Sequence, residues 1–497
     1  MGNRIPPSYR NKQIKFKIED NFFYFLYKKN KYNHNTLGDK MNKSIWDEIK
    51  IKEYKELDKN ITVDILIIGG GITGINTLYE LKDKNVCLVE RNRIGRGVTL
   101  NTTGKLTYLQ DILLNIINNN EKKATNYLKK QIEAIKIIKN RIEKNNIECD
   151  FTKTKSYLYV NNNVEDLKKI KKFLQKNKIK VNENDLNLLR YKYSISVDDT
   201  YLFNPLKYIK ELLNLINKNI YENTNIVDIK YKDNKYICST EKYKIIANKV
   251  ILATHYPYFI YPYFFPLKAY LEKSYLVAYK KPIGNISLIS LDKPVISIRN
   301  YKDYVIYLTN SHNICNKVND KENFKEISNK KIEYMWSNTD IITSDNIPYI
   351  GYIKDNLILA TGYNTWGMTN SVVASKIIKE LIENKKNKYI DLFDPLRINN
   401  KKRIIGNICS TLKGYYEGLK YKSDKIKYTK INGIDVIIYN DGKKEYIVKR
   451  KCPHAKCSLI FNETELTFDC PCHASRFDLE GNVIKGPSKY NIKIDKY

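Results

Sequence analysis

The sequence lacks any hydrophobic run long enough to cross a membrane. A membrane-spanning helix needs about 18 or more apolar residues in a row. The longest early candidate, residues 22–27 (FFYFLY), is far shorter and is flanked by charged residues. The N-terminal region also lacks the apolar segment and small-residue cleavage site of a signal peptide. We therefore expect no transmembrane segment and a cytoplasmic location.

Acidic residues are scarce relative to basic ones. The chain has 54 Asp and Glu against 87 Lys and Arg, which gives a formal net charge of +33. The basic residues are mostly Lys spread along the whole chain among Asn, Ile and Tyr, as an A/T-rich coding sequence would produce. A nucleic-acid-binding protein more often concentrates them in one segment or on one face. Nucleic-acid binding is therefore not favoured, although the charge can attract acidic partners or substrates over a long range.

The chain is long enough for two or three folded domains, with 497 residues of which 42% are hydrophobic. Residues 1–60 are polar and basic without clear periodicity, so we expect an N-terminal extension. Residues 37–41 (LGDKM) can be encoded with a purine-rich ribosome-binding sequence just ahead of the Met41 codon. We therefore hypothesise that translation can start at Met41 and that residues 1–40 lie outside the functional protein.

A glycine-rich turn follows the first clear strand pattern. Residues 63–68 (VDILII) are apolar on both faces, which is typical of a buried parallel strand. A helix is expected over 74–84, followed by a second strand that ends at Glu90. The turn fits G-x-G-x-x-G with Gly69, Gly71 and Gly74. Such glycines permit a tight turn, backbone approach to a pyrophosphate and close helix–strand packing, and Glu90 is placed to accept hydrogen bonds from ribose hydroxyls. The pattern predicts a site for FAD or NAD.

Three further segments have the pattern of a ligand-facing edge. Residues 93–107 (RIGRGVTLNTTGKLT) form a polar, glycine-bearing stretch directly after Glu90. Residues 250–255 (VILATH) and 357–370 (LILATGYNTWGMTN) each begin as a buried strand and end in small polar residues. Periodicity elsewhere predicts helices over about 120–145 and 370–382 and strands at 156–160 and 274–279.

Taken in order, these segments resemble the FAD-dependent oxidoreductases of the D-amino-acid oxidase and glycine oxidase superfamily over residues 45–395. Residues 336–351 also resemble the segment that precedes the flavin loop of that family. The resemblance implies an α/β FAD-binding domain of the glutathione-reductase-like Rossmann type, with a mixed-sheet α+β substrate domain inserted in two pieces. It implies that the AMP half of FAD is held by Gly69, Gly71, Gly74 and Glu90, and that the flavin is approached by Thr102, Thr103, Gly104, Gly362, Gly367, Met368 and Thr369.

The catalytic residues are not assigned by this resemblance. Members of the superfamily generally move a hydride from a C–H bond next to an amine nitrogen to the flavin, and the protein mainly positions the substrate. His255 lies in a segment placed near the dinucleotide half of FAD, so we expect a structural or cofactor-packing role for it. Tyr275 and Trp366 are candidates for the lining of the substrate pocket.

Histidine is also rare, with five residues in the chain, yet two of them lie in a cysteine cluster near the C-terminus. Cys452, Cys457, Cys470 and Cys472 fall within 21 residues. The other cysteines are isolated along the chain, at Cys87, Cys149, Cys238, Cys315 and Cys409. In a cytosolic chain, such a cluster indicates metal or redox chemistry more often than structural disulfides.

The spacing C-x-H-x15-C-x2-H gives each of two loops one thiolate and one imidazole. In a Rieske [2Fe–2S] centre two histidines replace two cysteines on one iron. We therefore expect Cys452 and Cys470 on one iron and His454 and His473 on the other. A Cys2His2 zinc site is the alternative, but zinc sites usually pair like ligands at C-x2–4-C and H-x3–5-H spacing. Short strand patterns over 426–448 indicate a small all-β domain around this site.

The C-terminal pattern further resembles the high-potential Rieske proteins of cytochrome bc-type complexes. That resemblance implies a disulfide between Cys457 and Cys472 that ties the two cluster loops together. It also implies that the hydroxyl of Ser475 bonds a cluster sulfide and that Gly486 and Pro487 belong to the loop covering the cluster.

Three residues depart from the Rieske pattern. Lys456 and Ala474 stand where the family usually has glycine, and Phe477 stands where high-potential members have tyrosine. Because the missing hydroxyl removes one hydrogen bond to a cluster thiolate, we expect a lower reduction potential than in those relatives.

The whole chain after residue 41 is similar to a known bacterial fusion of an FAD oxidoreductase with a C-terminal Rieske domain. The expected FAD-binding parts are about 61–150, 200–260 and 335–390, the substrate-domain parts about 151–199 and 261–334, the linker 391–415 and the Rieske domain 416–497.

This arrangement implies an enzyme that oxidises an amine, amino acid or similar small substrate. Electrons would pass from FAD through the [2Fe–2S] cluster to an external acceptor. Two alternatives stay open at this point, namely a redox sensor without metabolic turnover and an RNA-modifying flavoprotein that uses the basic surface.

Overall fold

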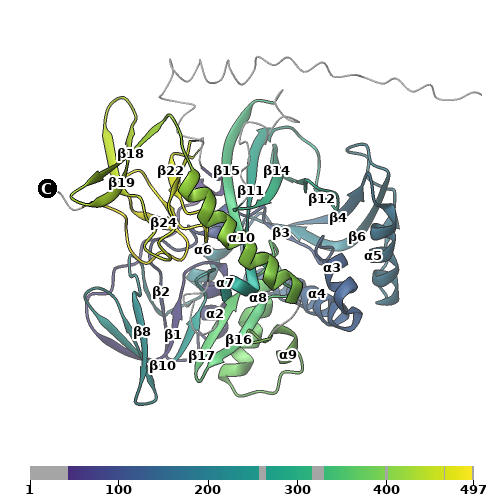
Figure 1. Cartoon of the computed structure of the whole chain (residues 1–497). Helices are drawn as coiled ribbons and strands as arrows, with labels where there is room; N and C mark the ends of the chain where they lie inside the picture. Colours follow the sequence, from purple (N-terminus) through teal and green to yellow (C-terminus); the bar gives the residue numbers. More distant parts are fainter. Residues whose placement is uncertain (1–42, 257–264, 316–329, 398–400, 464, 495–497) are drawn as a thin grey trace, which may run out of the picture.

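The computed structural model describes residues 43–256, 265–315, 330–397, 401–463 and 465–494 (Figure 1). The hypothesis that translation starts at Met41 concerns residues outside these ranges. The described part contains two large sheets and a C-terminal region of two small antiparallel sheets.

An eight-stranded sheet forms the centre of the predicted FAD-binding domain, in the order β16-β17-β10-β1-β2-β7, with the β8–β9 hairpin paired to β10. Its strands are β1 (Ile61–Ile68), β2 (Val86–Val89), β7 (Asn219–Tyr221), β8 (Asp228–Lys232), β9 (Lys235–Ser239), β10 (Lys244–Leu252), β16 (Tyr349–Lys354) and β17 (Leu357–Thr361). From β7 to β17 the neighbouring strands are parallel. Their carboxyl ends therefore meet at one edge, where a doubly wound sheet binds its ligand.

Helices pack on this sheet close to where the sequence predicts them. Helix α2 (Ile72–Glu80) follows the glycine turn and packs against α8 (Gly367–Ile382) and α6 (Pro205–Asn214). The structure starts α8 three residues earlier than predicted, so that Gly367, Met368 and Thr369 form its first turn. Their free amide groups point from a helix N-terminus, as an anion-stabilising site requires.

The second sheet has nine strands and contains both pieces of the predicted substrate domain, in the order β15-β11-β14-β13-β12-β4-β6-β3, with β5 paired to β6. Its strands are β3 (Lys105–Leu106), β4 (Thr152–Val160), β5 (Asn182–Glu183), β6 (Tyr193–Leu202), β11 (Ala269–Lys280), β12 (Ile286–Ser290), β13 (Ser297–Tyr301), β14 (Tyr304–Asn313) and β15 (Ile332–Thr343). The β12–β4 pair is parallel and the other pairs are antiparallel, so the sheet is mixed. The sheet includes β15, which ends at Thr343, whereas the second piece of the substrate domain was predicted to end at about residue 334.

Three further helices connect the two large sheets. They are α3 (Leu113–Asn119), α4 (Glu121–Lys144) and α5 (Val164–Lys176). Helix α4 occupies the range in which the sequence shows helical periodicity and packs against α3 and α8. Because α3 also contacts α5, which packs on β4 and β6, these helices link the second sheet to α8.

Residues 43–60, which the sequence assigns to an extension, are part of the folded domain. The short helix η1 (Ile45–Glu48) places Trp46 in full burial, and its indole Nε1 donates to the carbonyl of Thr102 at 2.7 Å. The segment therefore fixes one of the residues predicted to approach the flavin. The large apolar side chain of Trp46 was the sequence feature that could have indicated a folded segment here.

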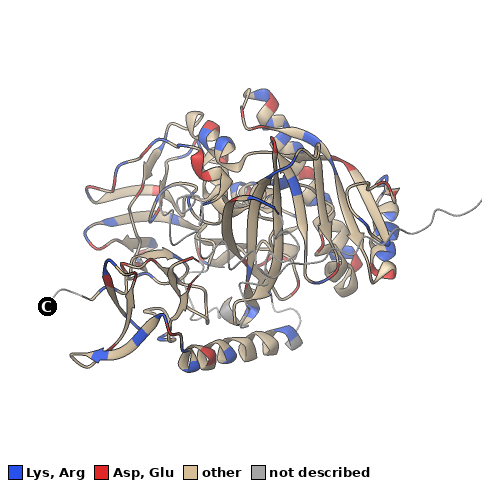
Figure 2. Cartoon of the chain, turned by 90° about the horizontal axis from the view of Figure 1, so that it is seen from above, with Lys and Arg blue, Asp and Glu red and all other residues tan. Residues whose placement is uncertain are grey.

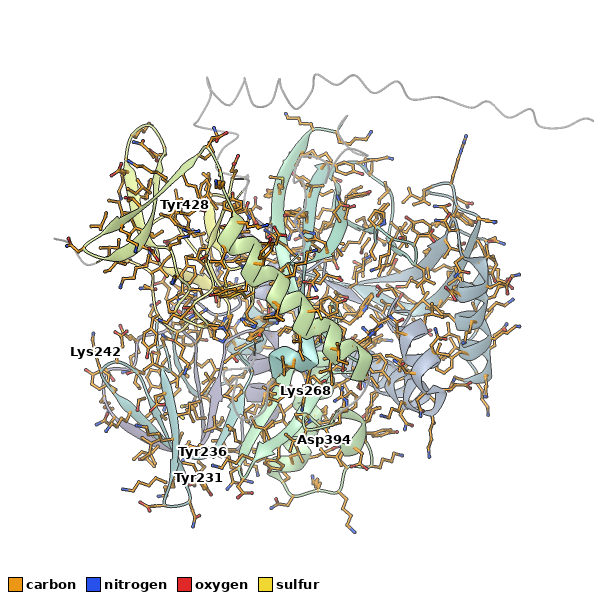
Figure 3. The ribbon with its side chains drawn as sticks, viewed as in Figure 1. Tyr231, Tyr236, Lys242, Lys268, Asp394 and Tyr428 are labelled. Carbon is orange, nitrogen blue, oxygen red and sulfur yellow. A yellow bond between two sulfur atoms is a disulfide. The ribbon has the colours of Figure 1, made fainter. Side chains whose placement is uncertain are left out.

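The C-terminal region has its own apolar core and two small sheets. The first contains β18 (Ile426–Ile431), β19 (Ile434–Asn440) and β20 (Glu445–Lys449), and the second contains β21 (Ile460–Asn462), β22 (Thr467–Asp469), β23 (Arg476–Phe477) and β24 (Val483–Lys485). In Figure 3, Tyr428 marks the first sheet, where its ring lies under the guanidinium of Arg450 at 4.2 Å. The three strand patterns predicted over 426–448 are all present as strands.

Between the flavin-binding region and this β region lies a 20-residue helix, α10 (Lys401–Lys420), where the sequence predicts a linker over 391–415. It crosses the front of the molecule in Figure 1 and packs on α7 (Phe265–Lys268) and β11. Figure 3 shows Lys268 of α7 directly below α10. Its Nζ donates to the carbonyl of Pro395 at 3.3 Å, which ties the start of this segment to the substrate domain.

Candidate active site and cluster site

The glycine turn after β1 has the geometry of a dinucleotide-binding turn. Gly69 has φ +113°, and a Cβ atom there would lie 2.5 Å from the carbonyl oxygen of Ala253. A Cβ atom on Gly74 would lie 1.9 Å from the carbonyl oxygen of Gly69. Only glycine permits this packing, and Gly71 is the N-cap residue of α2, whose first amide, that of Ile72, donates to the hydroxyl of Thr99 at 3.0 Å. These residues therefore fit a cofactor pyrophosphate.

Glu90 lies at the end of β2, as predicted, but both of its oxygens have backbone partners. Oε2 accepts from the amide of Gly70 at 2.7 Å and Oε1 from the amide of Asn92 at 2.8 Å. Burial raises the pKa of this carboxyl group. In this structure Glu90 ties the glycine turn to the end of β2, and its contact with ribose stays a prediction.

Three of the residues predicted to approach the flavin line one cavity of about 70 Å³. Thr102 and Thr103 line it from one side and Met368 from the start of α8. Gly104 and Gly362 have φ +70° and +73°, and a Cβ atom on either would clash with neighbouring atoms. These two glycines therefore shape the loops that border the cavity.

The buried side chain of Arg299 holds in place the loop at Thr103 and Gly104, which is predicted to approach the flavin. Arg299 of β13 donates to the carbonyl oxygens of Thr103 at 2.9 Å, Gly104 at 2.7 Å and Phe203 at 3.0 Å. The sequence contains no local signal for this role, because Arg299 lies almost 200 residues after the loop that it supports.

Four side chains that accept hydrogen bonds line the same cavity. Asp111, Glu272 and Asp340 contribute carboxylates, and Asn338 contributes an amide. Asn338 is 6% exposed, and its Nδ2 donates to Asp340 at 3.0 Å, while its buried Oδ1 has no partner among the described residues. Burial raises the pKa of Glu272 and raises that of Asp340 to about 6.

One cation lines this cavity among the described residues. The Nζ of Lys105 donates to the carbonyl of Leu288 at 2.8 Å and to the hydroxyl of Ser297 at 2.6 Å. Burial and the nearby charge of Arg299 hold the pKa of Lys105 well below its usual range. No arginine lines the described part of the cavity.

The three catalytic or lining candidates from the sequence have different positions. Trp366 lines the cavity and donates from Nε1 to Asp111 at 3.0 Å. Tyr275 packs beside His312 in another apolar cluster and is not among the residues lining the cavity. His255 contacts the carbonyl of Thr339 through Nε2 at 3.0 Å, and burial lowers its pKa to about 3, so its ring is neutral and structural.

The cluster loops bring the four predicted ligands together in a buried site. Cys452 and Cys470 are buried free thiols, and the rings of His454 and His473 lie 5.0 Å apart. Both ring nitrogens of His454 and Nδ1 of His473 are buried without a partner in the described chain. Burial lowers the pKa of His454 to about 4 and that of His473 to about 3, so both imidazoles are in the neutral form that binds metal. The orphaned nitrogens and free thiols fit a [2Fe–2S] cluster.

The structure contains the Cys457–Cys472 disulfide. The sulfur atoms of Cys457, Cys470 and Cys472 lie within 4.8 Å of one another, which by distance alone would be a three-thiolate site. The disulfide removes two of these sulfurs from metal binding, so Cys470 is the one available ligand of the three. This agrees with the predicted pairing of Cys470 with Cys452.

Ser475 and Gly486, which the Rieske resemblance assigns to the cluster site, pack against each other, and the bond from Ser475 to a cluster sulfide stays a prediction. The hydroxyl of Ser475 is fully buried and accepts from the amide of Ser488 at 3.1 Å. Gly486 has φ +100°, and a Cβ atom there would lie 2.5 Å from the Cα atom of Ser475. The covering loop therefore packs directly on the second cluster loop. Phe477 is fully buried in the same core.

A buried ion network joins the cluster region to the substrate domain. Lys273 of β11 pairs with Glu465 at 2.7 Å, and Arg476 of β23 pairs with Glu465 at 2.9 Å and with Asp469 at 3.1 Å. Lys485 of β24 also donates to the carbonyl of Thr339, beside the cavity, at 3.4 Å. The cluster region is therefore fixed against the wall of the cavity.

The model of a family described as FAD dependent oxidoreductase matches residues 64–381, more than half of the chain. This chain belongs to that family. The Rieske [2Fe-2S] domain model matches residues 416–496. The protein is therefore an FAD-dependent oxidoreductase with a Rieske domain, its cofactors are FAD and a [2Fe–2S] cluster, and the predicted fold class is confirmed.

Relatives cover both parts of this oxidoreductase. A Bacillus subtilis (strain 168) protein, named as the Rieske 2Fe-2S iron-sulfur protein YhfW, is 29% identical over 484 residues, which are 89% of this chain and 95% of that protein. Gamma-glutamylputrescine oxidoreductase of Escherichia coli (strain K12) is 21% identical over 67% of this chain and 86% of its own length. The crystal structure of L-proline dehydrogenase from P. horikoshii has a TM-score of 0.58 at 17% identity, over 68% of this chain and 98% of its own, and shows a shared fold.

Proposed function

We propose that this oxidoreductase oxidises the carbon next to nitrogen in an amine that carries no carboxylate group, and passes the electrons through its cluster to an external one-electron acceptor. The observation that carries the choice of substrate is the cavity wall formed by Asp111, Glu272, Asn338 and Asp340. Every one of these side chains can accept a hydrogen bond, and an ammonium group offers only donors.

The charges of the cavity favour a cation. Burial raises the pKa values of Glu272 and Asp340 even though the charge of Lys293 acts on Glu272 and that of Lys485 on Asp340 in the opposite direction, so positive charge compensates both carboxylates only in part. A bound ammonium would supply that charge and would also donate to the free Oδ1 of Asn338. An amino acid would bring a carboxylate of its own to this acidic wall. Among the described residues that line the cavity, no arginine is present to pair with that carboxylate. Like-charge repulsion therefore disfavours it.

The names of relatives point to the same broad class of chemistry. One is an oxidoreductase of gamma-glutamylputrescine, an amine that also carries a glutamyl carboxylate, and another is a dehydrogenase of L-proline, an amino acid. These names support oxidation next to nitrogen, and the preference for an amine without a carboxylate rests on the acidic wall alone.

The reaction balances with the groups of this chain and its cofactors. When bound, FAD supplies a two-electron acceptor and the cluster a one-electron carrier. A substrate R–CH2–NH3+ loses a nitrogen-bound proton to solvent and a hydride from carbon, and water hydrolyses the resulting iminium to an aldehyde and ammonium. The residues of the wall bind and orient the amine, and Trp366 fixes Asp111 for that contact. No described side chain is required as a base.

Anaerobic mixing of the purified holoprotein with amines tests this proposal. We expect n-butylamine or putrescine to bleach the flavin absorption, whereas glycine and L-proline do so at least about tenfold less efficiently. If no amine and no amino acid bleaches the flavin, the protein functions as a redox sensor and the proposal fails. If the amino acids are better reductants than the amines, oxidation stands but the amine assignment is wrong.

A pair of variants links the result to the cavity. Glu272→Gln should weaken binding of n-butylamine by about tenfold, because it removes one charge-assisted hydrogen bond. Glu333→Gln on β15 is the matched control, because Glu333 pairs with Tyr304 and Lys280 and does not line the cavity. Binding is measured from the shift of the flavin spectrum under anaerobic conditions. Equal affinity in both variants would place the amine elsewhere.

A further inference from the structure

Helix α10 carries an apolar stripe that faces away from the protein. Ile405, Cys409, Leu412, Tyr416 and Leu419 recur at intervals of three and four residues, and all five are exposed. Ile405 and Leu412 are the most exposed large apolar side chains of the described chain, at 62% and 65%. Such spacing places all five on one side of a helix, which normally faces a core.

The opposite side of α10 is packed tightly, so the outward position of the stripe is fixed. A Cβ atom on Gly414 would lie 2.4 Å from the carbonyl oxygen of Pro471, and one on Gly418 would lie 2.5 Å from that of Ser458. Asn407 donates to the carbonyl of Leu267 at 3.1 Å. In Figure 2 the helix runs along the outer edge of the molecule, beyond the sheets.

The charged residues of α10 are almost all basic. Its sequence, KKRIIGNICSTLKGYYEGLK, contains five Lys and Arg and a single acidic residue, Glu417. The whole chain carries a net charge of +33. Two copies of this surface would repel each other, whereas a surface of opposite charge would attract it.

We propose that α10 docks this protein on an anionic lipid surface, with the apolar stripe in the boundary between headgroups and acyl chains. An apolar stripe with basic residues on a 20-residue helix is the pattern of an interfacial helix. Within the described chain, no helix is long and apolar enough to cross a membrane, so α10 would lie on the bilayer.

Docking would bring the cluster loops close to the bilayer. Pro471 lies between ligands Cys470 and His473 and contacts the inner side of α10. The stripe is therefore separated from the second cluster loop by one helix, which is about 10 Å thick. A lipid-soluble or membrane-bound electron acceptor could approach the cluster from this side, whatever substrate the flavin site oxidises.

Vesicle flotation of the full-length holoprotein tests this proposal. We expect binding to vesicles of phosphatidylcholine mixed with phosphatidylglycerol, weaker binding as salt is raised, and little binding to phosphatidylcholine alone. Equal binding to both vesicle types, or no binding to either, would overturn the proposal. This comparison uses the unmodified protein and does not depend on the folding of a variant.

A double variant and a matched control test the stripe itself. Leu412→Glu with Tyr416→Glu should lower the bound-to-free ratio by about tenfold or more, since two apolar anchors become charges that anionic lipid repels. Ile434→Glu alters an exposed apolar residue of β19 and should bind like the unmodified protein. The visible spectrum of the cluster checks folding. Retained binding by the double variant would overturn the proposal. A dimer of the unmodified protein in the absence of lipid, which the double variant does not form, would also overturn it and would show that the stripe binds a second copy of the chain.

Discussion

The ring of Tyr256 meets the imidazole of His473 edge-on, with the ring centroids 6.1 Å apart. The same tyrosine also lies 6.2 Å from the ring of His454. Three residues earlier, Ala253 contacts the glycine turn at Gly69. One short segment after β10 therefore touches both the dinucleotide turn and the two predicted histidine ligands of the cluster.

Replacing Tyr256 should distinguish packing from the role of its hydroxyl. Tyr256→Ala leaves a void beside both imidazoles, and we expect a loss of about 3 kcal/mol and a fall in bound iron. Tyr256→Phe keeps the ring and should retain the cluster. Iron content and the EPR spectrum of the reduced protein measure the difference. An alanine variant with full iron content and an unchanged spectrum would contradict this role.

Helix α10 should be sensitive to added volume at one glycine and insensitive at another. Gly414→Ala forces a methyl group against Pro471, which we expect to destabilise the protein by about 1–3 kcal/mol and to loosen the cluster loop. Gly406→Ala on the same helix has no heavy atom within 4 Å of the new Cβ atom, so it should stabilise slightly through helix propensity. Thermal midpoints and iron content provide the measurement. A Gly414→Ala variant as stable as Gly406→Ala would show that the helix can move.

The ion network should make the domain interface sensitive to the loss of Glu465. Glu465→Gln leaves the buried charges of Lys273 and Arg476 with Asp469 as their remaining network partner, and we expect a loss of about 3 kcal/mol. Flavin fluorescence and the visible signal of the cluster, followed during heating, should separate into two transitions. One coincident, unshifted transition would argue against a structural role for this network.

The same carboxylates predict the response to acid. Burial opposes the ionisation of Glu465 and Asp469, but Arg476 and Lys273 outweigh it and hold both pKa values below their usual range. Their contribution to stability is therefore complete above the unfolded pKa values, near pH 4–4.5, and declines as pH falls through the lower folded values. Unfolding midpoints measured from about pH 7 to pH 3 should fall in acid. Glu465→Gln should flatten this decline, and an equally steep one would exclude Glu465 as a source.

The disulfide next to the cluster should contribute to the stability of the C-terminal region. Cys457 and Cys472 are 15 residues apart, and closing such a loop contributes about 3 kcal/mol. The double variant Cys457→Ser with Cys472→Ser should therefore unfold at a lower temperature and lose its cluster faster than the unmodified protein when no reductant is present. Cys87→Ser, which alters an isolated buried thiol, provides the comparison. Equal rates of cluster loss would contradict the prediction.

Local features were predictable because their residues are neighbours in the chain. The glycine turn with Glu90 and the two cluster loops each combine a short spacing with one kind of chemistry, so periodicity and ligand type were sufficient to place them. Residues 391–415 were expected to be a linker because the chain turns polar after Pro395, whereas residues 401–420 form a helix that contains three glycines. Two of those glycines, Gly414 and Gly418, allow close packing on the cluster loops, and this tertiary contact supports a helix of low intrinsic propensity.

The sequence by itself determined the two cofactor classes and indicated an FAD-dependent oxidoreductase followed by a Rieske domain, while the residues nearest to each cofactor stay predictions. The tertiary structure alone decided the acidic cavity wall, in which Asp111 meets Asn338 and Asp340 from more than 200 residues away. It also decided the outward direction of the stripe on α10 and the position of Tyr256 between the two sites. These features depend on which faces of distant elements become buried together, and that choice is made by the packing of the whole chain rather than by any local pattern.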